Sequence, residues 1–263
     1  MGAAYARAAA ALGAKVIVND LDADVAEQVV TEIRNAGGMA VAAVEDIRDP
    51  KAAERVIQRC VDEFGSITGL VNNAAIFTQA LFAEESVEAL RALIDVNMIG
   101  LFNTSRAAVG RMLAQGRGSI INITSGAQTG QNGLSSYGAT KGAVASFTYA
   151  WAGELQNSGV RVNAISPMAA TRMSHDIPNL PPPEANIPPV MFLLSDRAEG
   201  LTGQVIRIIG NKLSIMAHPA NRAPVLESDS WSLDTVAEAF DTKLRALALP
   251  TNVATYEITA IFT

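Results

Sequence analysis

Apolar runs rich in β-branched residues alternate with helical stretches between residues 3 and 209, and this alternation constrains the fold most strongly. Strands alternating with helices imply right-handed crossovers and a parallel sheet with helices on both faces. The sequence therefore predicts an α/β fold with a doubly wound parallel sheet, in which ligands bind beyond the carboxyl ends of the strands. The expected strands are Lys15–Asn19, Met39–Val44, Gly69–Asn72, Ser119–Thr124, Val160–Ile165 and Gln204–Ile209. The expected helices are Ala3–Leu12, Ala23–Asn35, Pro50–Phe64, Ser86–Ala114, Ser135–Gln156 and Pro183–Leu194.

Composition excludes several classes of function. The 263 residues fit one α/β domain, and 49% hydrophobic with 17% charged residues suits a sheet covered on both faces. A net charge of −6 without a Lys/Arg cluster argues against nucleic-acid and anionic-membrane partners. No apolar run approaches the roughly 18–20 residues of a membrane span. Cys60 is the only cysteine, and His175 and His218 are isolated, so we expect a cytoplasmic protein without a disulfide or a metal site.

Ser125, Tyr137 and Lys141 form the pattern Ser-x11-Tyr-x3-Lys. Tyr137 and Lys141 are four residues apart and share one face of a helix. A cation beside a phenol favours the phenolate and lowers its pKa from about 10. Such a phenol can exchange a proton with an alcohol, and Ser125 ends an expected strand from which its hydroxyl can reach the same space. A Tyr-x-x-x-Lys pair alone is a weak motif, because many exposed helices contain one.

Three further runs accompany this pattern in a recognisable order: Leu70–Ala75 (LVNNAA), Asp95–Asn97 (DVN) and Val162–Pro167 (VNAISP). Together they resemble the short-chain dehydrogenase/reductase family from about residue 2 to about residue 213. The resemblance implies a Rossmann-like domain and a hydride-transferring oxidoreductase. It assigns proton transfer to Tyr137, the lowering of its pKa and the nicotinamide ribose to Lys141, substrate orientation to Ser125 and support of a proton-relay water to Asn97.

The same resemblance implies a nicotinamide cofactor. A carboxylate at the end of the family's second strand accepts hydrogen bonds from a ribose diol and repels a 2′-phosphate. Asp20, after the strand Lys15–Asn19, resembles this carboxylate, and Leu21 rather than an arginine follows it, so NAD is favoured over NADP. The Pro167–Thr171 segment resembles the nicotinamide-binding loop, although Met168 replaces the usual glycine. The predicted cofactor-binding residues are Gly2, Asp20, Leu21, Asp46, Ile47, Asn73, Ala74, Ala75, Tyr137, Lys141, Pro167, Met168 and Thr171.

The phosphate-binding turn poses a problem. Met1-Gly2 resembles only the end of the family's Gly-x-x-x-Gly-x-Gly turn, and no strand precedes it. A central strand makes two ladders of about five hydrogen bonds, which at about 1 kcal/mol each amount to 5–10 kcal/mol. Two explanations stay open: the natural protein begins upstream of an internal Met1, or the alternating segment Ala254–Thr263 occupies the position of the strand.

The remainder of the sequence bears on substrate and assembly. We expect a dehydrogenase domain at 1–213 and an extension at 214–263, with an amphipathic helix in Ser230–Leu249. The helices Ser86–Ala114 and Ser135–Gln156 are candidate interfaces of a homodimer or homotetramer.

The chain also resembles, more loosely, the 3-hydroxyacyl-CoA dehydrogenase part of peroxisomal type 2 multifunctional enzymes. This resemblance implies that the substrate is an acyl-thioester alcohol, such as an acyl-CoA. It is carried by Ala4–Ala6, Val18–Leu21, Pro167–Met173, Pro183–Glu184 and Lys212–Leu213. The alternatives are a 3-oxoacyl-carrier-protein reductase, a dehydrogenase of small secondary alcohols, and an inactive scaffold that lacks the phosphate-binding turn.

Overall fold

The computed structural model describes residues 1–174, 179–221 and 223–248. The chain divides into two units, Met1–Met216 and Ala217–Thr263. The segment Ala254–Thr263, for which we predicted a strand, lies outside the described residues, as does His175. Within the described ranges, no helix combines the length and apolar character needed to cross a membrane.

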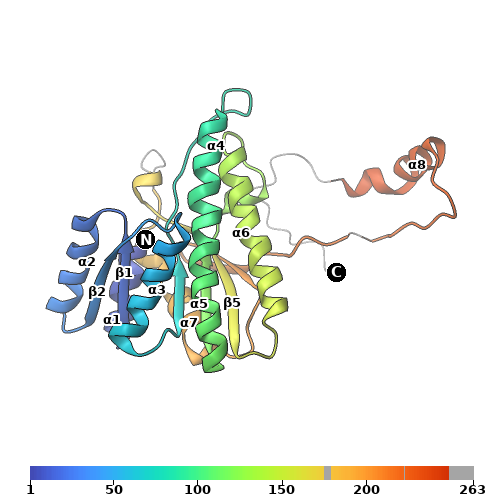
Figure 1. Ribbon diagram of the computed structural model, residues 1–263. Coiled ribbons are helices and arrows are strands. Elements are labelled where there is room, and N and C mark those ends of the chain that lie inside the picture. Colours follow the sequence, from blue (N-terminus) through green and yellow to red (C-terminus); the bar gives the residue numbers. More distant parts are fainter. Residues whose placement is uncertain (175–178, 222, 249–263) are drawn as a thin grey trace. The chain divides into compact units, whose positions relative to one another are not determined.

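The strands of the first unit form two sheets (Figure 1). One sheet pairs β1 with β2, and the other has the order β3-β4-β5-β6-β7. All neighbours are parallel except β6 and β7, which are antiparallel. The strand bounds are Lys15–Asp20 (β1), Met39–Val44 (β2), Gly69–Asn72 (β3), Gly118–Ile123 (β4), Val160–Met168 (β5), Val205–Ile209 (β6) and Lys212–Ile215 (β7). The predicted α/β fold with a doubly wound, largely parallel sheet is confirmed.

The break between the two sheets falls between β1 and β3. Each of these strands has one hydrogen-bonded neighbour, β2 and β4 respectively. Helix α1 (Gly2–Ala11) packs against both sheets, because Tyr5 belongs to the apolar core over β4, β5 and β6 while Ala10 belongs to the core over β1 and β2. The two sheets are therefore joined by packed side chains rather than by a shared ladder of hydrogen bonds.

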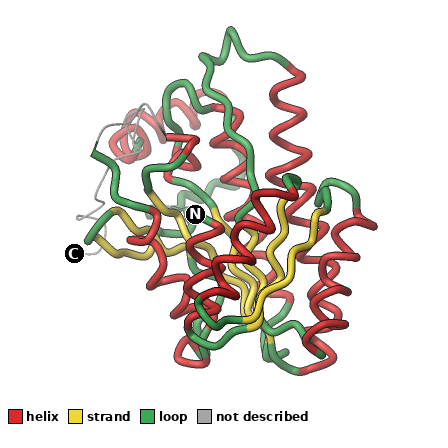
Figure 2. Tube along the Cα trace, turned by 90° about the vertical axis from the view of Figure 1, so that its left-hand side faces the viewer, coloured by secondary structure: helices red, strands yellow, loops and turns green. Residues whose placement is uncertain are grey.

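Helices cover both faces of the sheets (Figure 2). One face carries α1, α2 and α7, whose apolar side chains pack on the strands in two clusters. The other face carries α3, α5 and α6, which pack on β3, β4 and β5. The bounds are Ala23–Asn35 (α2), Pro50–Phe64 (α3), Val87–Ile94 (α4), Leu101–Gln115 (α5), Ser135–Glu154 (α6) and Ile187–Leu194 (α7).

Local signals set several helix ends. Asp22 and Asp49 accept hydrogen bonds from backbone amides in the first turns of α2 and α3, as expected of N-cap carboxylates. Pro50 occupies the first turn of α3, where its missing N–H is no loss. Gly65 ends α3 at φ +84°, a left-handed conformation that glycine adopts without steric cost.

Three regions differ from the prediction. The expected helix Ser86–Ala114 is interrupted by a π-helical turn at Asp95–Gly100. Strand β7 was not predicted, because its four residues are all exposed and give no buried pattern. In the second unit, the predicted helix Ser230–Leu249 appears as α8 (Leu233–Ala239) followed by two short turns of π and 3-10 helix, Phe240–Leu244 and Arg245–Leu247.

Candidate functional site

The carboxyl ends of the strands bring together the segments that the sequence marked as functional. Asp20 ends β1, Asn73 follows β3, Ser125 follows β4 and Met168 ends β5. The strands β1, β3, β4 and β5 each run parallel to their neighbours. These positions therefore lie along the edge at which α/β sheets bind ligands.

Ser125 and Tyr137 lie close together. Ser125 leads into the 3-10 turn Gly126–Thr129, and hydrogen bonding by its side chain lowers the pKa of the Tyr137 phenol. A Cβ added to Gly138 would lie 2.5 Å from the Ala127 carbonyl oxygen. Only glycine therefore lets α6 approach the Ser125 turn this closely, and the approach places the phenol beside the hydroxyl.

Lys141 lies one helical turn beyond Tyr137 and is buried. Its ammonium group is 5.7 Å from the centre of the Tyr137 ring. It also donates a hydrogen bond of 2.9 Å to the carbonyl of Ile123 in β4. This bond ties α6 to the strand that precedes Ser125, so three of the four predicted catalytic residues, Ser125, Tyr137 and Lys141, form one cluster.

The electrostatics of the cluster differ from the sequence-based expectation. We expected Lys141 to lower the Tyr137 pKa, whereas the net shift of the Tyr137 pKa in this structure is upward. Burial raises the pKa of Tyr137, and the hydrogen bond from Ser125 offsets part of that rise. Burial also lowers the pKa of Lys141 to about 8, because no carboxylate compensates its charge. Desolvation, which a sequence pattern does not reveal, dominates both groups.

Asn97 lies in the π-helical turn, a type of turn that is frequent at functional sites. Its side-chain oxygen accepts from the amide of Ile76 at 2.8 Å. Its side-chain nitrogen donates to the Ile76 carbonyl at 3.0 Å and to the Thr140 hydroxyl at 3.2 Å. The amide thus joins the segment after β3 to α6, next to Tyr137. Its role in holding a proton-relay water stays a prediction.

Two predicted cofactor residues meet at the start of α1. A Cβ on Gly2 would lie 2.8 Å from the side-chain nitrogen of Asn73, so the helix N-terminus comes directly against the end of β3. Asp20 accepts a 3.1 Å hydrogen bond from the amide of Asp22 through one carboxylate oxygen. Asp22, not Asp20, caps α2. Leu21 lies between them and is 62% exposed. Neither of the two residues that follow Asp20 in the turn is basic.

Asp46 and Ile47 form a second fixed turn after β2. Arg48 makes a 2.6 Å ion pair with Asp46 and lowers the pKa of that carboxyl group. The side chain of Asn103 in α5 donates to the carbonyls of Ile47 and Arg48 at 3.0 and 3.1 Å. This turn, whose residues Asp46 and Ile47 are predicted to bind the cofactor, is therefore held against α5.

The Pro167–Thr171 segment continues from β5. Asn186 donates to the Met168 carbonyl at 3.2 Å, and Ser174 donates to the Ala169 carbonyl at 2.7 Å. The Thr171 amide donates to the Ser174 hydroxyl at 2.9 Å. Met168 in place of glycine is accommodated at the end of the strand. Ala74 and Ala75 lie in the segment between Asn73 and Ile76, where Ala74 is exposed and Ala75 half-buried.

The sequence did not reveal several residues beside this cluster. Asn72 is buried and bonds to Asn122, Ser105 and Thr104 at 2.9, 2.8 and 2.6 Å. The Phe77 ring meets the Tyr137 ring edge-on at 5.0 Å. Glu85 accepts hydrogen bonds from the first turn of α6. Adjacent amides at the end of a strand were a usable signal for Asn72, whereas the other contacts join segments distant in sequence.

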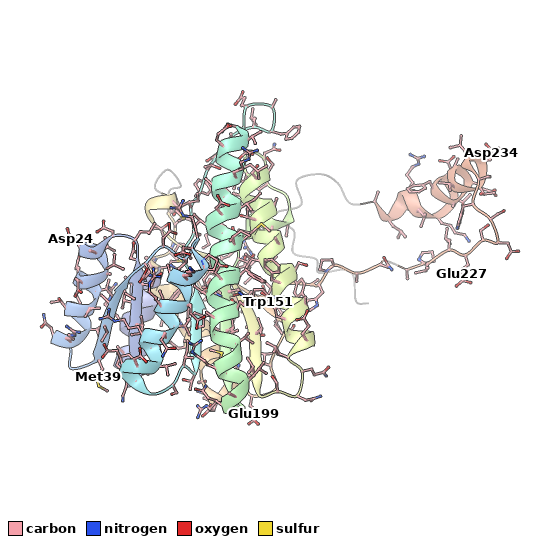
Figure 3. The ribbon with its side chains drawn as sticks, in the orientation of Figure 1. Asp24, Met39, Trp151, Glu199, Glu227 and Asp234 are labelled. Carbon is pink, nitrogen blue, oxygen red and sulfur yellow. The ribbon has the colours of Figure 1, made fainter. Side chains whose placement is uncertain are left out.

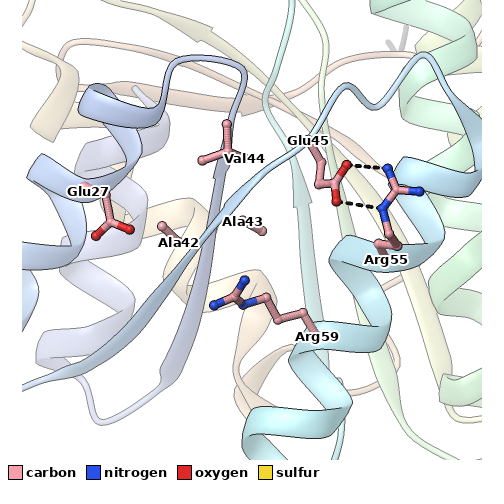
Figure 4. A pocket seen from close by; sticks show the side chains of 7 residues that line it. All are labelled: Glu27, Ala42, Ala43, Val44, Glu45, Arg55 and Arg59. Carbon is pink, nitrogen blue, oxygen red and sulfur yellow. Dashed lines mark hydrogen bonds and ion pairs between the residues drawn. The ribbon is translucent and has the colours of Figure 1, made fainter.

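A hollow of about 420 Å³ lies elsewhere, beside the outer strand β2 (Figure 4). Glu45 and Arg55 form an ion pair within it at 2.6 Å. It contains none of the predicted site residues, so we define the candidate site by its side chains and not by this hollow. Its lining residues are Glu27, Ala42, Ala43, Val44, Glu45, Arg55 and Arg59.

Comparison with known proteins agrees with this geometry. The short chain dehydrogenase family matches residues 1–179. The chain belongs to the short-chain dehydrogenase family. It is 37% identical over 235 residues to the 2,5-dichloro-2,5-cyclohexadiene-1,4-diol dehydrogenase LinX of Sphingobium indicum, covering 80% of this chain and 90% of that protein.

A longer relative supports the looser resemblance noted in the sequence. The peroxisomal hydratase-dehydrogenase-epimerase of Saccharomyces cerevisiae is 35% identical over 210 residues, which cover 73% of this chain and 23% of that protein. Among solved structures, a short chain dehydrogenase from Mycobacterium avium matches with a TM-score of 0.85 and 34% identity over 94% of this chain and 91% of that chain. A gluconate 5-dehydrogenase from Burkholderia cenocepacia, in complex with NADP and tartrate, matches with a TM-score of 0.74 and 26% identity over 79% of this chain and 88% of that one.

Membership of the short-chain dehydrogenase family establishes the class of reaction. Its relatives are dehydrogenases and reductases that transfer hydride with a nicotinamide cofactor and act on small molecules. The chain is thus an oxidoreductase of this class by family.

Proposed function

We propose that this short-chain dehydrogenase oxidises a secondary alcohol, or reduces the matching ketone, with Ser125, Tyr137 and Lys141 as its catalytic residues. The observation that carries the proposal is the cluster at the end of β4, where the Lys141 ammonium group lies 5.7 Å from the centre of the Tyr137 ring and Ser125 lowers the pKa of the Tyr137 phenol. The nicotinamide supplies or accepts the hydride. Tyr137 exchanges the proton with the substrate oxygen, Ser125 orients that oxygen, and the cation of Lys141 favours the phenolate.

The residues at the carboxyl ends of the strands fit a nicotinamide dinucleotide. One carboxylate oxygen of Asp20 accepts a hydrogen bond from the Asp22 amide. The other carboxylate oxygen can accept hydrogen bonds from the adenosine ribose hydroxyls. The contact of Gly2 with Asn73 brings a helix N-terminus to this edge, where a pyrophosphate is favoured. We propose NAD as the preferred cofactor because Asp20 would repel a 2′-phosphate. NADP, which the Burkholderia neighbour binds, is the alternative.

For the substrate we propose a 3-hydroxyacyl thioester such as an acyl-CoA. The similarity to the yeast hydratase-dehydrogenase-epimerase supports this choice. The similarity to LinX supports a cyclic secondary alcohol instead, and a 3-oxoacyl-carrier-protein reductase of Synechocystis is 36% identical over 226 residues. The proposed catalytic steps are the same for all three substrates.

A homo-oligomer is the proposed assembly, through the face of α5 and α6. Phe102 of α5 is 40% exposed, and its ring centre is 6.2 Å from that of Trp151 of α6. The Trp151 ring stacks on the Phe147 ring with 4.9 Å between their centres. Figure 3 labels Trp151 on the helix pair. Exposed aromatic side chains of this kind are typical of protein interfaces. The cytoplasmic location and the division at residue 213 stay predictions.

The test is a titration of the chain with NADH and with NADPH, followed by turnover assays with 3-hydroxyacyl-CoA, 3-oxoacyl thioesters and cyclic secondary alcohols. Micromolar binding of NADH and turnover that Tyr137→Phe abolishes would support the proposal. Absence of binding at millimolar NADH would favour the inactive-scaffold alternative.

A further inference from the structure

The segment from Ile76 to Glu85 is attached to the Tyr137 end of α6 at several points. At its start, the backbone N–H of Ile76 donates to the side-chain oxygen of Asn97, and the Ile76 carbonyl accepts from the side-chain nitrogen of Asn97. In its middle, the amide of Ala80 donates to the carbonyl of Gly133 at 3.0 Å. At its end, Glu85 accepts hydrogen bonds from the hydroxyls of Ser135 and Ser136.

Glu85 supplies an acceptor at the N-terminus of α6, where the helix has no capping side chain of its own. The N-cap residue of α6, Leu134, has no side chain that can accept a hydrogen bond, and the first turn contains no acidic residue. A carboxylate near a helix N-terminus is stabilised by the helix dipole and by donors in the first turn. Glu85 supplies this carboxylate from a distant segment, and its other oxygen accepts from the Thr78 hydroxyl at 3.4 Å.

The attachment has a consequence at Tyr137, which directly follows Ser136. Phe77, next to Ile76 and Thr78, places its ring edge-on against the Tyr137 ring with an interplanar angle of 77°. Beyond these fixed contacts, Leu81 and Phe82 at the tip of the segment are 57% and 87% exposed. The segment is thus anchored near the phenol, and it exposes two apolar side chains at its tip.

We propose that Glu85 is a positioning residue, which holds the Ile76–Glu85 segment on α6 so that Phe77 forms an apolar wall of the substrate site beside the Tyr137 phenol. This inference rests on the proposed function of Tyr137. Phe77 touches the reacting phenol, so a substrate whose oxygen reaches Tyr137 meets this ring with its adjoining carbon atoms. The wall favours a hydrocarbon portion, such as an acyl chain or an alicyclic ring, next to the reacting carbon.

The decisive comparison is Glu85→Ala against Glu84→Ala. Glu84 is the adjacent exposed carboxylate and is not part of the attachment, so its replacement controls for the loss of one negative charge. Misplacement of a group that contacts the reacting atoms by about 1 Å can cost up to 10²-fold in rate. We expect Glu85→Ala to lower kcat/KM about 10- to 100-fold, chiefly through KM for the alcohol, with NADH affinity unchanged. Glu85→Gln keeps an acceptor for the serines and should restore most of the loss.

A double-mutant cycle tests whether Glu85 acts through Phe77. If it does, Glu85→Ala adds little to the effect of Phe77→Ala, because the wall is already lost. Fully additive effects of the two substitutions, or equal kinetics of Glu85→Ala and Glu84→Ala, would overturn the proposal.

Hydrogen exchange of the 77–85 peptide gives a readout that needs no turnover. Glu85→Ala should speed exchange there, including at the Ala80 amide, while Glu84→Ala should not. Unchanged exchange would show that Glu85 does not hold the segment. If no alcohol is turned over by the wild type, the proposed function fails, whereas the exchange comparison still decides the attachment.

Discussion

The two sheets of this molecule are held in different ways. Every residue of β4, in the five-stranded sheet, is buried, and β4 has a partner along each edge. In the two-stranded sheet, none of the six residues of β1 is buried, and its edge away from β2 has no partner strand among the described residues. A two-stranded sheet is marginal by itself and depends on what packs against it.

This difference coincides with a division of function. We call the five-stranded sheet with its helices the buried half, and the two-stranded sheet with its helices the cofactor half. The proposed catalytic residues Ser125, Tyr137 and Lys141 are held by β4 and α6, within the buried half. Asp20 and Asp46, proposed to hold the adenosine end of the cofactor, follow β1 and β2 and are fixed by helix packing and ion pairs at the surface. Exposed pairs such as Arg7–Glu32 contribute little, typically below about 1 kcal/mol. Chemistry is therefore expected to tolerate perturbation less than cofactor affinity does.

The largest effect is expected from Tyr137→Phe. Loss of a general acid–base group typically lowers kcat about 10²- to 10⁴-fold. The edge-on contact with Phe77 needs only the ring, so the fold and NADH affinity should be retained. Steady-state kinetics and an NADH titration measure the two quantities. Wild-type kcat in this variant would mean that the buried half does not carry the chemistry.

The next largest effect is on stability, and it is tested by removing one side-chain amide from each sheet. Asn72→Ala leaves the buried Thr104 hydroxyl and Asn122 side chain without their Asn72 partner, and it should reduce the free energy of unfolding by about 2–4 kcal/mol. Asn19→Ala in β1 removes bonds from a side chain that is only half-buried to the carbonyls of Ala43 and Glu45, and it should reduce the free energy of unfolding by about 1 kcal/mol. Urea unfolding measures both. Equal losses would break the distinction between the halves.

The sequence predicted what local chemistry determines. The helix predicted from Pro50 begins there as α3, and the Ser125, Tyr137 and Lys141 spacing marked a cluster that the fold does assemble. Apolar runs marked β1 to β6, in which most residues are buried or half-buried, whereas the exposed β7 gave no such signal. Properties that arise from tertiary contact were beyond reach: the raised pKa of Tyr137 comes from burial, and Glu85 meets Ser136 across 51 positions of the chain.

A smaller effect concerns the buried charge of Lys141. Its pKa is about 10.5 when exposed and about 8 in the fold. Between these values the unfolded chain binds more protons, so stability rises with pH in this window, and below pH 8 the full penalty of burying the cation is present. Lys141→Met should abolish activity, yet raise the free energy of unfolding at pH 7 by roughly 1–3 kcal/mol.

Urea unfolding of wild type and Lys141→Met at pH 7, 8, 9 and 10 measures this difference. The advantage of the variant should shrink as the pH rises from 8 towards 10.5. A constant difference between the two proteins would show that Lys141 carries no buried charge, and the electrostatic account of the catalytic half would have to change.

The smallest effect is expected on cofactor affinity, from a substitution at the end of β1. Asp20→Asn keeps an oxygen for the Asp22 amide, so the turn after β1 should stay intact. It removes the charge that binds ribose hydroxyls and repels a 2′-phosphate. A hydrogen bond to a charged group contributes about 1.5–3 kcal/mol. Because Asp20 is only half-buried, we expect the lower end of this range, a loss of about tenfold in NADH affinity. NADPH affinity should rise and kcat should change little.

Parallel NADH and NADPH titrations of wild type, Asp20→Asn and the exposed control Asp24→Asn would decide this point. If Asp20→Asn changes neither affinity, the cofactor does not meet β1, and the two-stranded half is only a structural support. If it lowers kcat as strongly as Tyr137→Phe, the halves are coupled more tightly than their separate ladders of hydrogen bonds suggest. A change in affinity with kcat intact is the result that the division into a buried catalytic half and a helix-packed cofactor half requires.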